Sequence, residues 1–346
     1  LFGAGLIGGR LRQGSMNTTA FSFGPLGAKG FAFLNMLQLI GWTSIMIYDA
    51  MLALQTLAPL SPMIWTIAIG ALVILWLFIG LHNTGYVQAI VSLLLLSLTF
   101  YMGMHMIAQW PSESNLVSDG SMSFIAALEL SIAMPLSWLP LISDYTRESK
   151  HPFTASLTSA TVYTVTSIVM YTLGLSAAIF GGGDSIITIM MNAGLGLAGL
   201  LVIIFSTVTT TFMDAYSAGV SSTTIYNSAS SKGIAVIVTI IGTIAAILYP
   251  MDDITDFLYL IGSVFTPMIA ILLADYFMNR QQVQTLSAFL VRGTIWAVSV
   301  GLYHYMLHSE STVGATLPAF TMAFIITTII GFVSKAVKVS TEVKQP

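Results

Sequence analysis

The residues of this chain that are best placed to do chemistry lie in the stretch STVTTTFMDAY at 206–216, within an otherwise apolar segment. Ser206, Thr209 and Thr210 are spaced by three and four residues, which puts three hydroxyl oxygens on one face of a helix. Hard cations such as sodium prefer oxygen ligands. The spacing therefore predicts a sodium site formed by these three side chains. The alternative is structural, because serine and threonine hydroxyls in helices also bond back to the carbonyl four residues earlier.

A carboxylate follows these hydroxyls. Asp214 stands one turn after Thr210 on the same face, with Thr211 beside it. A carboxylate in the middle of a membrane span costs roughly 2.5–3.5 kcal/mol on insertion scales, so its presence there indicates a function. We expect Asp214 to accept a hydrogen bond from an amino group of a substrate, and Thr211 to help bind that substrate. The alternative is that Asp214 pairs with a buried donor elsewhere in the protein.

A second polar stripe keeps to one face of the apolar segment 30–57. Its members are Asn35, Gln38, Trp42 and Asp49. A tryptophan in the bilayer centre, away from the interfacial belt, offers a flat surface on which a planar ligand can stack. The stripe predicts that Gln38 and Trp42 bind the substrate. The alternative is a core tryptophan with an amide that bonds across helices.

The segment MPLSWLPLISDYTR at 134–147 carries two prolines, Pro135 and Pro140, inside one apolar span. Each proline removes a helical hydrogen bond and clashes with the carbonyl four residues earlier, so a broken helix is predicted. Broken helices near the membrane midplane are typical of transporter binding sites. Trp138, between the prolines, is therefore assigned to the substrate site. A simple kink is the alternative, and Glu129, nearer the outer end, is either a snorkelling or a proton-handling acid.

Membrane helices must position these residues. The chain has 346 residues, of which 56% are hydrophobic and 7% charged, against roughly 25% charged in soluble domains. Its mean hydropathy is +0.88, so lipid must cover most of its surface. We predict an all-α polytopic membrane protein with ten full transmembrane helices. They lie near 30–57, 62–81, 86–107, 123–143, 154–180, 198–225, 233–250, 256–278, 284–307 and 316–336.

The basic residues predict the orientation of these spans. If the connection 9–29 is inside, ten of the eleven Lys and Arg residues lie in inside connections, which is the positive-inside pattern. The C-terminus is then cytoplasmic, in a multi-pass protein of the plasma membrane. The exception is Arg292, within a helix near its cytoplasmic start, where its side chain is expected to snorkel to the interface. The ten are Arg10, Arg12, Lys29, Arg147, Lys150, Lys232, Arg280, Lys335, Lys338 and Lys344.

Other function classes have little support in the sequence. The chain has no cysteine for thiolate metal sites and no hydrolase or phosphate-loop motif, and its net charge of −3 comes without a basic cluster that would suit nucleic acid. GAGLIG at 3–8 matches the dinucleotide pattern GxGxxG, but close packing of membrane helices through small residues explains it better. We expect no enzymatic activity and no cofactor. The expected partners are the lipid bilayer, a small-molecule substrate and a coupling cation.

Three segments resemble the nucleobase:cation symporter-1 family of cytosine and hydantoin permeases, and most closely its hydroxymethylpyrimidine transporter branch. They are LSWLPLISDYTRESKHP, TTTFMDAYSAGVS and DFLYLIGSVFTPMIAILLADYF. The resemblance implies a LeuT-like bundle of inverted repeats, as a single transporter domain over residues 1–346. SFGPLGAKG followed by LQLIGWTS resembles the loop into the family's third helix. The chain is therefore expected to be N-terminally truncated, without the first helix and most of the second.

The resemblance also implies roles for particular residues. Trp42 matches the family's substrate-stacking tryptophan, and Ser206, Thr209 and Thr210 match the ligands of its sodium site. The implied function is secondary active import of a pyrimidine, hydroxymethylpyrimidine or cytosine, with sodium or a proton. Met46 stands where hydantoin-transporting relatives carry a substrate-binding glutamine. An amino-acid carrier of the same architecture remains an alternative, as do, from other classes, a membrane-embedded enzyme and a channel.

Overall fold

The computed structural model of the chain describes residues 1–56, 60–79, 81–108, 123–180, 196–251, 253–280, 282–283, 285–309 and 312–342. Within these ranges all regular secondary structure is helical, in agreement with the all-α prediction. Lys344, one of the basic residues predicted to be cytoplasmic, lies outside the described residues.

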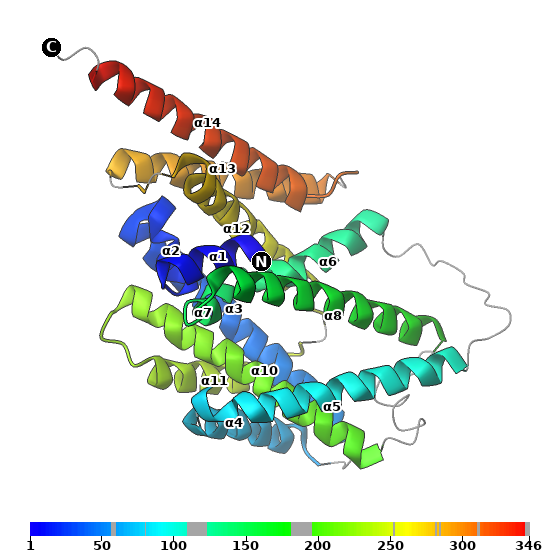
Figure 1. Cartoon of the computed structure of the whole chain (residues 1–346). Coiled ribbons are helices and arrows are strands. Elements are labelled where there is room, and N and C mark those ends of the chain that lie inside the picture. The colour runs from blue at the N-terminus through cyan, green and yellow to red at the C-terminus, as the bar shows by residue number, and fades with distance from the viewer. Residues whose placement is uncertain are drawn as a thin grey trace.

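Ten helical stretches among the described residues are long and apolar enough to cross a membrane, which confirms the ten predicted spans. The first span begins earlier than predicted, at Ala20, and has a kink at Gly24, whose φ is +64°. In chain order the helices (Figure 1) are α1 (Phe2–Leu11), α2 (Ser15–Thr18), α3 (Ala20–Gln55), α4 (Pro62–Ile79), α5 (Leu81–Ala108), α6 (Phe124–Ser137), α7 (Ile142–Thr146), α8 (Pro152–Phe180), α10 (Gly196–Ile225), α11 (Ser231–Leu248), α12 (Thr255–Leu273), the π-helix η1 (Ala274–Asn279), α13 (Leu286–His308) and α14 (Thr316–Glu342).

The predicted broken helix is present between α6 and α7. α6 ends at Ser137, α7 begins at Ile142, and residues 138–141 form turns between them. Pro135 lies in the last turn of α6, and Pro140 lies within the break. The two prolines therefore interrupt the helix where the sequence predicted it, since neither can donate an N–H to a carbonyl of the preceding turn.

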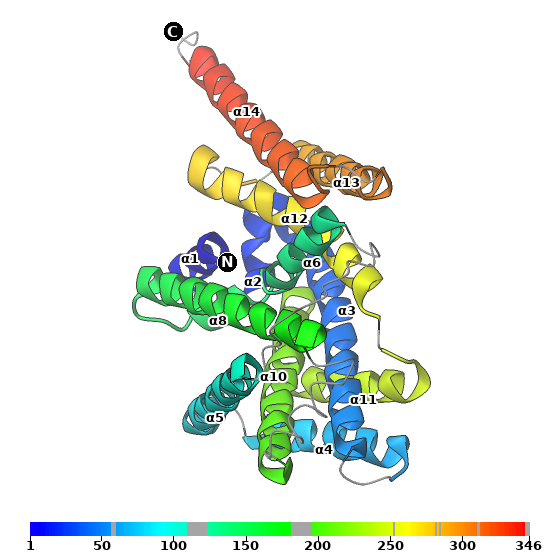
Figure 2. The same cartoon turned by 90° about the vertical axis from the view of Figure 1, so that its right-hand side faces the viewer.

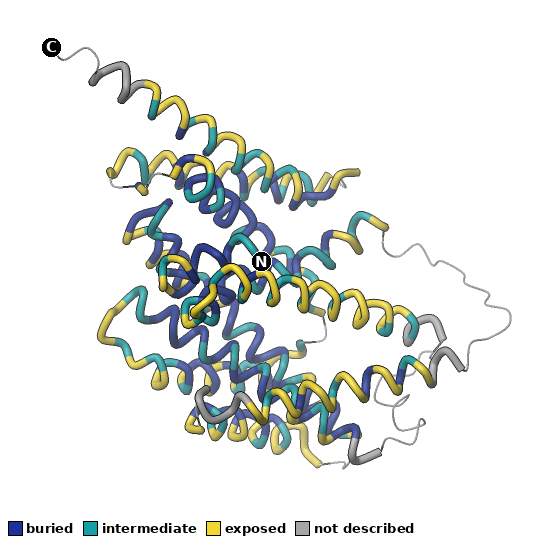
Figure 3. Tube along the Cα trace, viewed as in Figure 1, coloured by how far each residue is buried: buried dark blue, intermediate teal, exposed yellow. Residues whose placement is uncertain are grey.

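Helices α3, α10 and α12 form the buried centre of the molecule. α3 packs along α10 and α11, and α12 packs against α6 and α14 (Figure 2). In Figure 3 the traces of α5, α8 and α14 show long exposed sides. These sides are apolar: Leu93, Ile168 and Phe332 are each more than half exposed. Large apolar surfaces of this kind suit hydrocarbon as their surroundings, as expected for a multi-pass membrane protein.

Three of the connections predicted to be cytoplasmic meet one another. The Arg12 guanidinium donates to the carbonyl of Arg147, with an Nη1–O distance of 3.4 Å. The backbone N–H of Val283 donates to the carbonyl of Phe21 at 2.8 Å. In Figure 1, α2, α7 and the connection from α10 to α11 all lie toward the left of the molecule. These contacts place the connections on one side, as the charge pattern requires.

The GAGLIG segment is part of α1 and packs closely against α7. A Cβ at Gly8 would lie 2.1 Å from the Ser143 Cβ, so only glycine permits this approach. The approach lets Ser143 and Thr146 donate their hydroxyls to the carbonyls of Ala4 and Gly5, at 2.9 and 2.8 Å. The segment is therefore a helix-packing surface, and it holds α7, the second part of the broken helix.

The expectation that Arg292 snorkels is wrong. Its side chain is buried and forms a two-point ion pair with Asp275 in η1, with Nη2–Oδ1 at 3.0 Å and Nε–Oδ2 at 3.3 Å. Asn279 donates from Nδ2 to the same Oδ1 at 2.8 Å. The buried carboxylate of Asp275 is a planar partner for the guanidinium. Because this partner lies inside the protein, the Arg292 side chain does not extend to the membrane interface.

Candidate functional site

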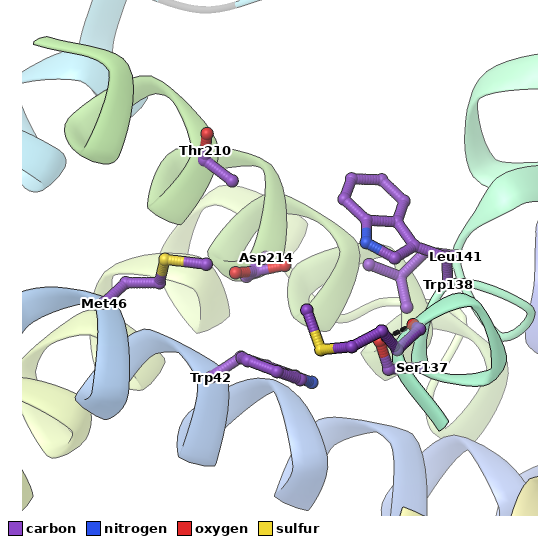
Figure 4. Close-up of a pocket in the computed structure, with 8 residues that line it drawn as sticks. Trp42, Met46, Ser137, Trp138, Leu141, Thr210 and Asp214 are labelled. Carbon is purple, nitrogen blue, oxygen red and sulfur yellow. Dashed lines mark hydrogen bonds between the residues drawn. The ribbon is translucent and has the colours of Figure 1, made fainter. Parts of the chain in front are cut away.

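One pocket of the described structure lies between α3, α10 and the break of the α6–α7 helix (Figure 4). It contains about 340 Å³ of empty space, including the part that is open to the surroundings. Four residues predicted to form the site, Trp42, Trp138, Thr210 and Asp214, line this one pocket. The full lining is Trp42, Met46, Met134, Ser137, Trp138, Leu141, Thr210 and Asp214.

The Asp214 side chain is the polar centre of the pocket. It is 5% exposed, and among the described residues no side chain or backbone N–H donates to its carboxylate. In Figure 4 this carboxylate lies between Met46 on one side and Trp138 on the other, next to the Trp42 ring. No Lys, Arg or His is among the described residues that line the pocket. The carboxylate is thus free to accept hydrogen bonds from a bound molecule.

Trp42 supplies an aromatic face to the same space. Figure 4 shows its ring edge-on, with one face turned toward Asp214. Phe257 of α12 packs against it in an edge-to-face arrangement, with the ring centroids 5.5 Å apart and an angle of 70°. The indole Nε1 is buried and has no hydrogen-bond partner. A planar ligand that lies beside Asp214 can therefore stack on the ring face that is turned toward this carboxylate.

The carbonyls freed by the break are satisfied from α3. Gln38 donates from Nε2 to the carbonyl of Ser137 at 3.1 Å, and Asn35 donates from Nδ2 to the carbonyl of Pro140 at 3.4 Å. The Asn35 amide also donates to the Ser221 hydroxyl of α10 at 2.8 Å. Gln38 lies outside the pocket lining, and its Oε1 is buried without a partner. The structure places this predicted substrate residue as a brace for the broken helix.

Two of the three predicted sodium ligands bond to their own helix. Thr209 and Thr210 both donate their hydroxyls to the carbonyl of Ser206 at 2.9 Å. Figure 4 shows the Thr210 hydroxyl pointing away from Asp214, so its methyl group faces the pocket. Thr211 donates to the carbonyl of Thr207 at 2.7 Å and lies outside the pocket lining. Each hydroxyl donates its hydrogen, which leaves the oxygen lone pairs able to accept or to bind a cation.

Sequence reasoning did not assign four of the lining residues to the site: Met46, Met134, Ser137 and Leu141. The last three share the spacing of a helix face with Trp138, which could have identified them. The Ser137 hydroxyl donates to the carbonyl of Met134 at 2.6 Å, so the last turn of α6 closes on itself beside the pocket. Most of the surface that these residues add is apolar, as in most small-molecule sites.

The sequence matches a family described as permeases for cytosine/purines, uracil, thiamine and allantoin, over residues 4–345. The cytosine permease of Escherichia coli strain K12 is 26% identical over 185 residues, which is 52% of this chain and 44% of that protein. The cytosine permease of E. coli O157:H7 matches to the same extent. The chain therefore matches less than half the length of these curated relatives.

Two solved structures share the fold. Mhp1, a nucleobase-cation-symport-1 family transporter in a closed conformation with bromovinylhydantoin bound, superposes with a TM-score of 0.77 at 16% identity, covering 97% of this chain and 82% of that one. A Na⁺-coupled sialic acid symporter in a substrate-bound outward-open state gives a TM-score of 0.63 at 15% identity, covering 97% and 83%. These likenesses support the LeuT-like fold that the resemblance implied.

Proposed function

Since this chain belongs to the family of permeases for cytosine/purines, uracil, thiamine and allantoin, we propose that it acts in cation-coupled import of a pyrimidine such as cytosine or hydroxymethylpyrimidine. The family consists of permeases and not of enzymes. The observation that carries the proposal is the pocket at the helix break, where the free carboxylate of Asp214 lies beside the face of Trp42. The excess of basic residues on one side supports a plasma-membrane protein with a cytoplasmic C-terminus.

An aminopyrimidine fits this pocket in shape and in polarity. Its ring is planar and stacks on Trp42, while Met46, Met134 and Leu141 provide apolar contacts. The stacking contact adds about 1–3 kcal/mol, the range found for nucleic-acid bases on aromatic side chains. Trp138 lines the same pocket from the side of the helix break.

Asp214 selects the amino-bearing edge of the ring. An aminopyrimidine presents an exocyclic NH₂ beside a ring nitrogen that can be protonated, and a carboxylate accepts from both. A charge-assisted bond of this kind is worth about 1.5–3 kcal/mol. An oxo-pyrimidine such as uracil offers carbonyl oxygens instead of the amino group, and the carboxylate repels them. The pocket therefore favours cytosine-like over uracil-like ligands.

The coupling cation is assigned to the α10 hydroxyls. Ser206, Thr209 and Thr210 share one face of α10, and Thr210 lies one turn before Asp214. The Thr209 and Thr210 hydroxyls donate to the Ser206 carbonyl, which leaves their oxygen lone pairs able to bind a cation. The Na⁺-coupled sialic acid symporter of the same fold supports sodium as that ion. A proton is the second candidate, because Asp214 is a buried acid without a cationic neighbour in the pocket lining.

Radiolabelled uptake tests the proposal directly. Cells that express the protein are given labelled cytosine, hydroxymethylpyrimidine, uracil or leucine, with and without a sodium gradient. We expect accumulation of one of the two aminopyrimidines above that of cells carrying the empty vector. Accumulation of leucine and of no pyrimidine would instead indicate an amino-acid carrier of the same fold.

Asp214→Asn sharpens the test, because it keeps the size and one acceptor oxygen but removes the charge. It should weaken competition by cytosine roughly 10- to 150-fold, the equivalent of a lost charge-assisted bond, and change competition by uracil much less. Asp256→Asn, at an exposed acid of α12, is the matched control. An equal loss for cytosine and uracil would show that Asp214 does not read the amino group.

A further inference from the structure

The orientation of the Trp42 ring is set by packing alone. The face of this ring that is turned toward Asp214 is the surface assigned to stacking of the substrate (Figure 4). No hydrogen bond fixes that face, because the indole Nε1 is buried and has no partner among the described residues. The torsion that turns an aromatic ring about its Cβ–Cγ bond has broad minima. A neighbouring side chain must therefore hold the ring at the angle that suits a ligand.

Phe257, in the first turn of α12, is an aromatic side chain in contact with this ring. The two rings meet edge to face, with their centroids 5.5 Å apart and an interplanar angle of 70°. Such a pair has a preferred geometry, because the edge and the face of an aromatic ring carry opposite partial charges. Rotation of the indole away from this angle loses the contact. Phe257 therefore favours one orientation of Trp42.

Gly41, the residue before Trp42, lets the Phe257 ring lie against the backbone of α3. A Cβ at Gly41 would lie 2.6 Å from Cζ and 2.7 Å from Cε2 of that ring. Any larger residue at this position would displace the ring. The Phe257 ring thus contacts α3 at two consecutive residues, which limits its own movement.

The backbone that carries Phe257 is fixed at the start of α12. The Asp253 carboxylate accepts the backbone N–H of Thr255 at 2.9 Å. Leu258 is buried in the same apolar cluster as Trp42, and Phe257 packs against that cluster. The Phe257 side chain itself lies outside the pocket lining. Its effect on a ligand must therefore pass through Trp42.

From these contacts we propose that Phe257 is a positioning residue of the substrate site, which holds the face of Trp42 toward Asp214 and makes the site selective for flat aromatic rings. This role rests on the proposed function, because it assumes that the substrate stacks on Trp42. A puckered, saturated ring with the same polar groups can bond to Asp214 but gains little from a correctly oriented indole face.

The size of the effect follows from the fraction of molecules in which the ring is correctly oriented. Without Phe257 the indole has the stacking orientation for only part of the time, and the dissociation constant rises in inverse proportion to that fraction. The strength of an edge-to-face pair corresponds to a factor of about 2 to 13. Phe257→Leu should raise the dissociation constant for cytosine by this factor.

Competition binding on the purified protein in detergent, with sodium present, measures the effect. Labelled cytosine is displaced by unlabelled cytosine or by a saturated six-membered cyclic guanidine, which offers an amino group and an adjacent ring nitrogen but no aromatic ring. Phe257→Leu should weaken the binding of cytosine and change that of the cyclic guanidine much less. Phe257→Tyr keeps the ring and should restore the selectivity of wild type.

Gly41→Ala displaces the Phe257 ring from the α3 side, so it should also weaken cytosine binding, although alanine is the better helix former. Gly30→Ala is the matched control on α3, because nothing lies within 4 Å of a Cβ at that position, and it should bind as wild type. Phe153→Leu removes another edge-to-face pair, with Phe2 at 5.4 Å and 84°, which joins α8 to α1. This second control should also leave cytosine binding unchanged.

A double variant tests whether Phe257 acts through Trp42. In a Trp42→Ala background, Phe257→Leu should cause no further loss of cytosine affinity, because the ring that it positions is gone. A further loss of the same size, an equal loss for cytosine and the cyclic guanidine, or unchanged cytosine affinity in Phe257→Leu would each overturn this inference alone. A wild-type protein that binds no pyrimidine would overturn the proposed function and this inference with it.

Discussion

Glu129 on α6 and Thr316 at the start of α14 join two helices that are distant in sequence. The Glu129 carboxylate accepts the Thr316 hydroxyl at 2.5 Å and the Thr316 backbone N–H at 3.1 Å, and it also accepts the N–H of Ala315 at 3.0 Å. A carboxylate at a helix N-terminus satisfies amides that have no partner within the helix. Gly314, whose φ is +74°, leaves space for the Glu129 carboxylate, because a Cβ at this position would lie 2.0 Å from Oε1. The Glu129 side chain therefore points into the protein and does not snorkel.

Removing this acid should destabilise the protein. Glu129→Ala leaves buried N–H groups without acceptors, so we expect the free energy of unfolding to fall by about 1–3 kcal/mol. Glu129→Gln keeps one acceptor oxygen and should lose less. Denaturant unfolding in detergent measures both, with Glu148→Gln as the exposed control, for which about 0–1 kcal/mol is expected. Unchanged stability in Glu129→Ala would mean that water replaces the carboxylate.

Trp42→Ala should weaken substrate binding roughly 5- to 150-fold, because it removes a stacking contact worth about 1–3 kcal/mol. Trp42→Phe keeps a smaller aromatic face and should have a milder effect. Trp76→Ala, on α4 and outside the pocket lining, is the control for loss of a large side chain. Binding is measured by competition against labelled substrate, at matched expression. Equal affinity of Trp42→Ala and wild type would exclude stacking on this ring.

Thr210→Val should raise the sodium concentration needed for half-maximal uptake while changing substrate affinity at saturating sodium much less. Valine keeps the methyl that faces the pocket and removes the oxygen assigned to the cation. Thr239→Val makes the same change on α11, where a buried hydroxyl donates to the carbonyl of Ala235 at 2.9 Å, and should leave the sodium dependence unaltered. Uptake that is indifferent to sodium in wild type would remove the role assigned to Thr210.

The ion pair of Arg292 and Asp275 predicts a larger loss of stability for a single variant than for the double variant. Arg292→Met leaves the fully buried Asp275 without its cation, which should cost about 3–5 kcal/mol of stability. The double variant Arg292→Met with Asp275→Leu should recover most of that loss, because no charge is then left unpaired. Thermal unfolding in detergent ranks the two. A double variant that is less stable than Arg292→Met would show that the pair also serves another purpose.

Periodicity predicted the parts of the structure that depend on one helix at a time. The ten spans follow from apolar length, and the break follows from Pro135 and Pro140. Trp42 and Asp214 were recognised because a tryptophan away from the interfacial belt and a carboxylate in mid-span are unusual in a membrane helix. Both were assigned to the substrate site, and both line one pocket in the structure.

The contacts that the sequence did not predict depend on which helices are neighbours. Gln38 reaches a carbonyl 99 positions away, and Glu129 reaches Thr316 at a separation of 187. Arg292 was expected to snorkel, because its position near a helix end is visible in the sequence while the location of Asp275 beside it is not. A single sequence shows which face of a helix is polar, but not what that face meets.

The amides that satisfy the broken helix have a consequence for how the pocket opens. The amides of Asn35 and Gln38 on α3 donate to the carbonyls of Pro140 and Ser137, so both carbonyls have hydrogen-bond partners in the buried interior. Backbone groups left unsatisfied in hydrocarbon cost several kcal/mol each. A movement that separates α3 from the break must supply water to both carbonyls. The pocket can therefore open between α3 and the helix break only on a side where water can enter. Opening of the pocket and hydration of the two carbonyls must then occur together.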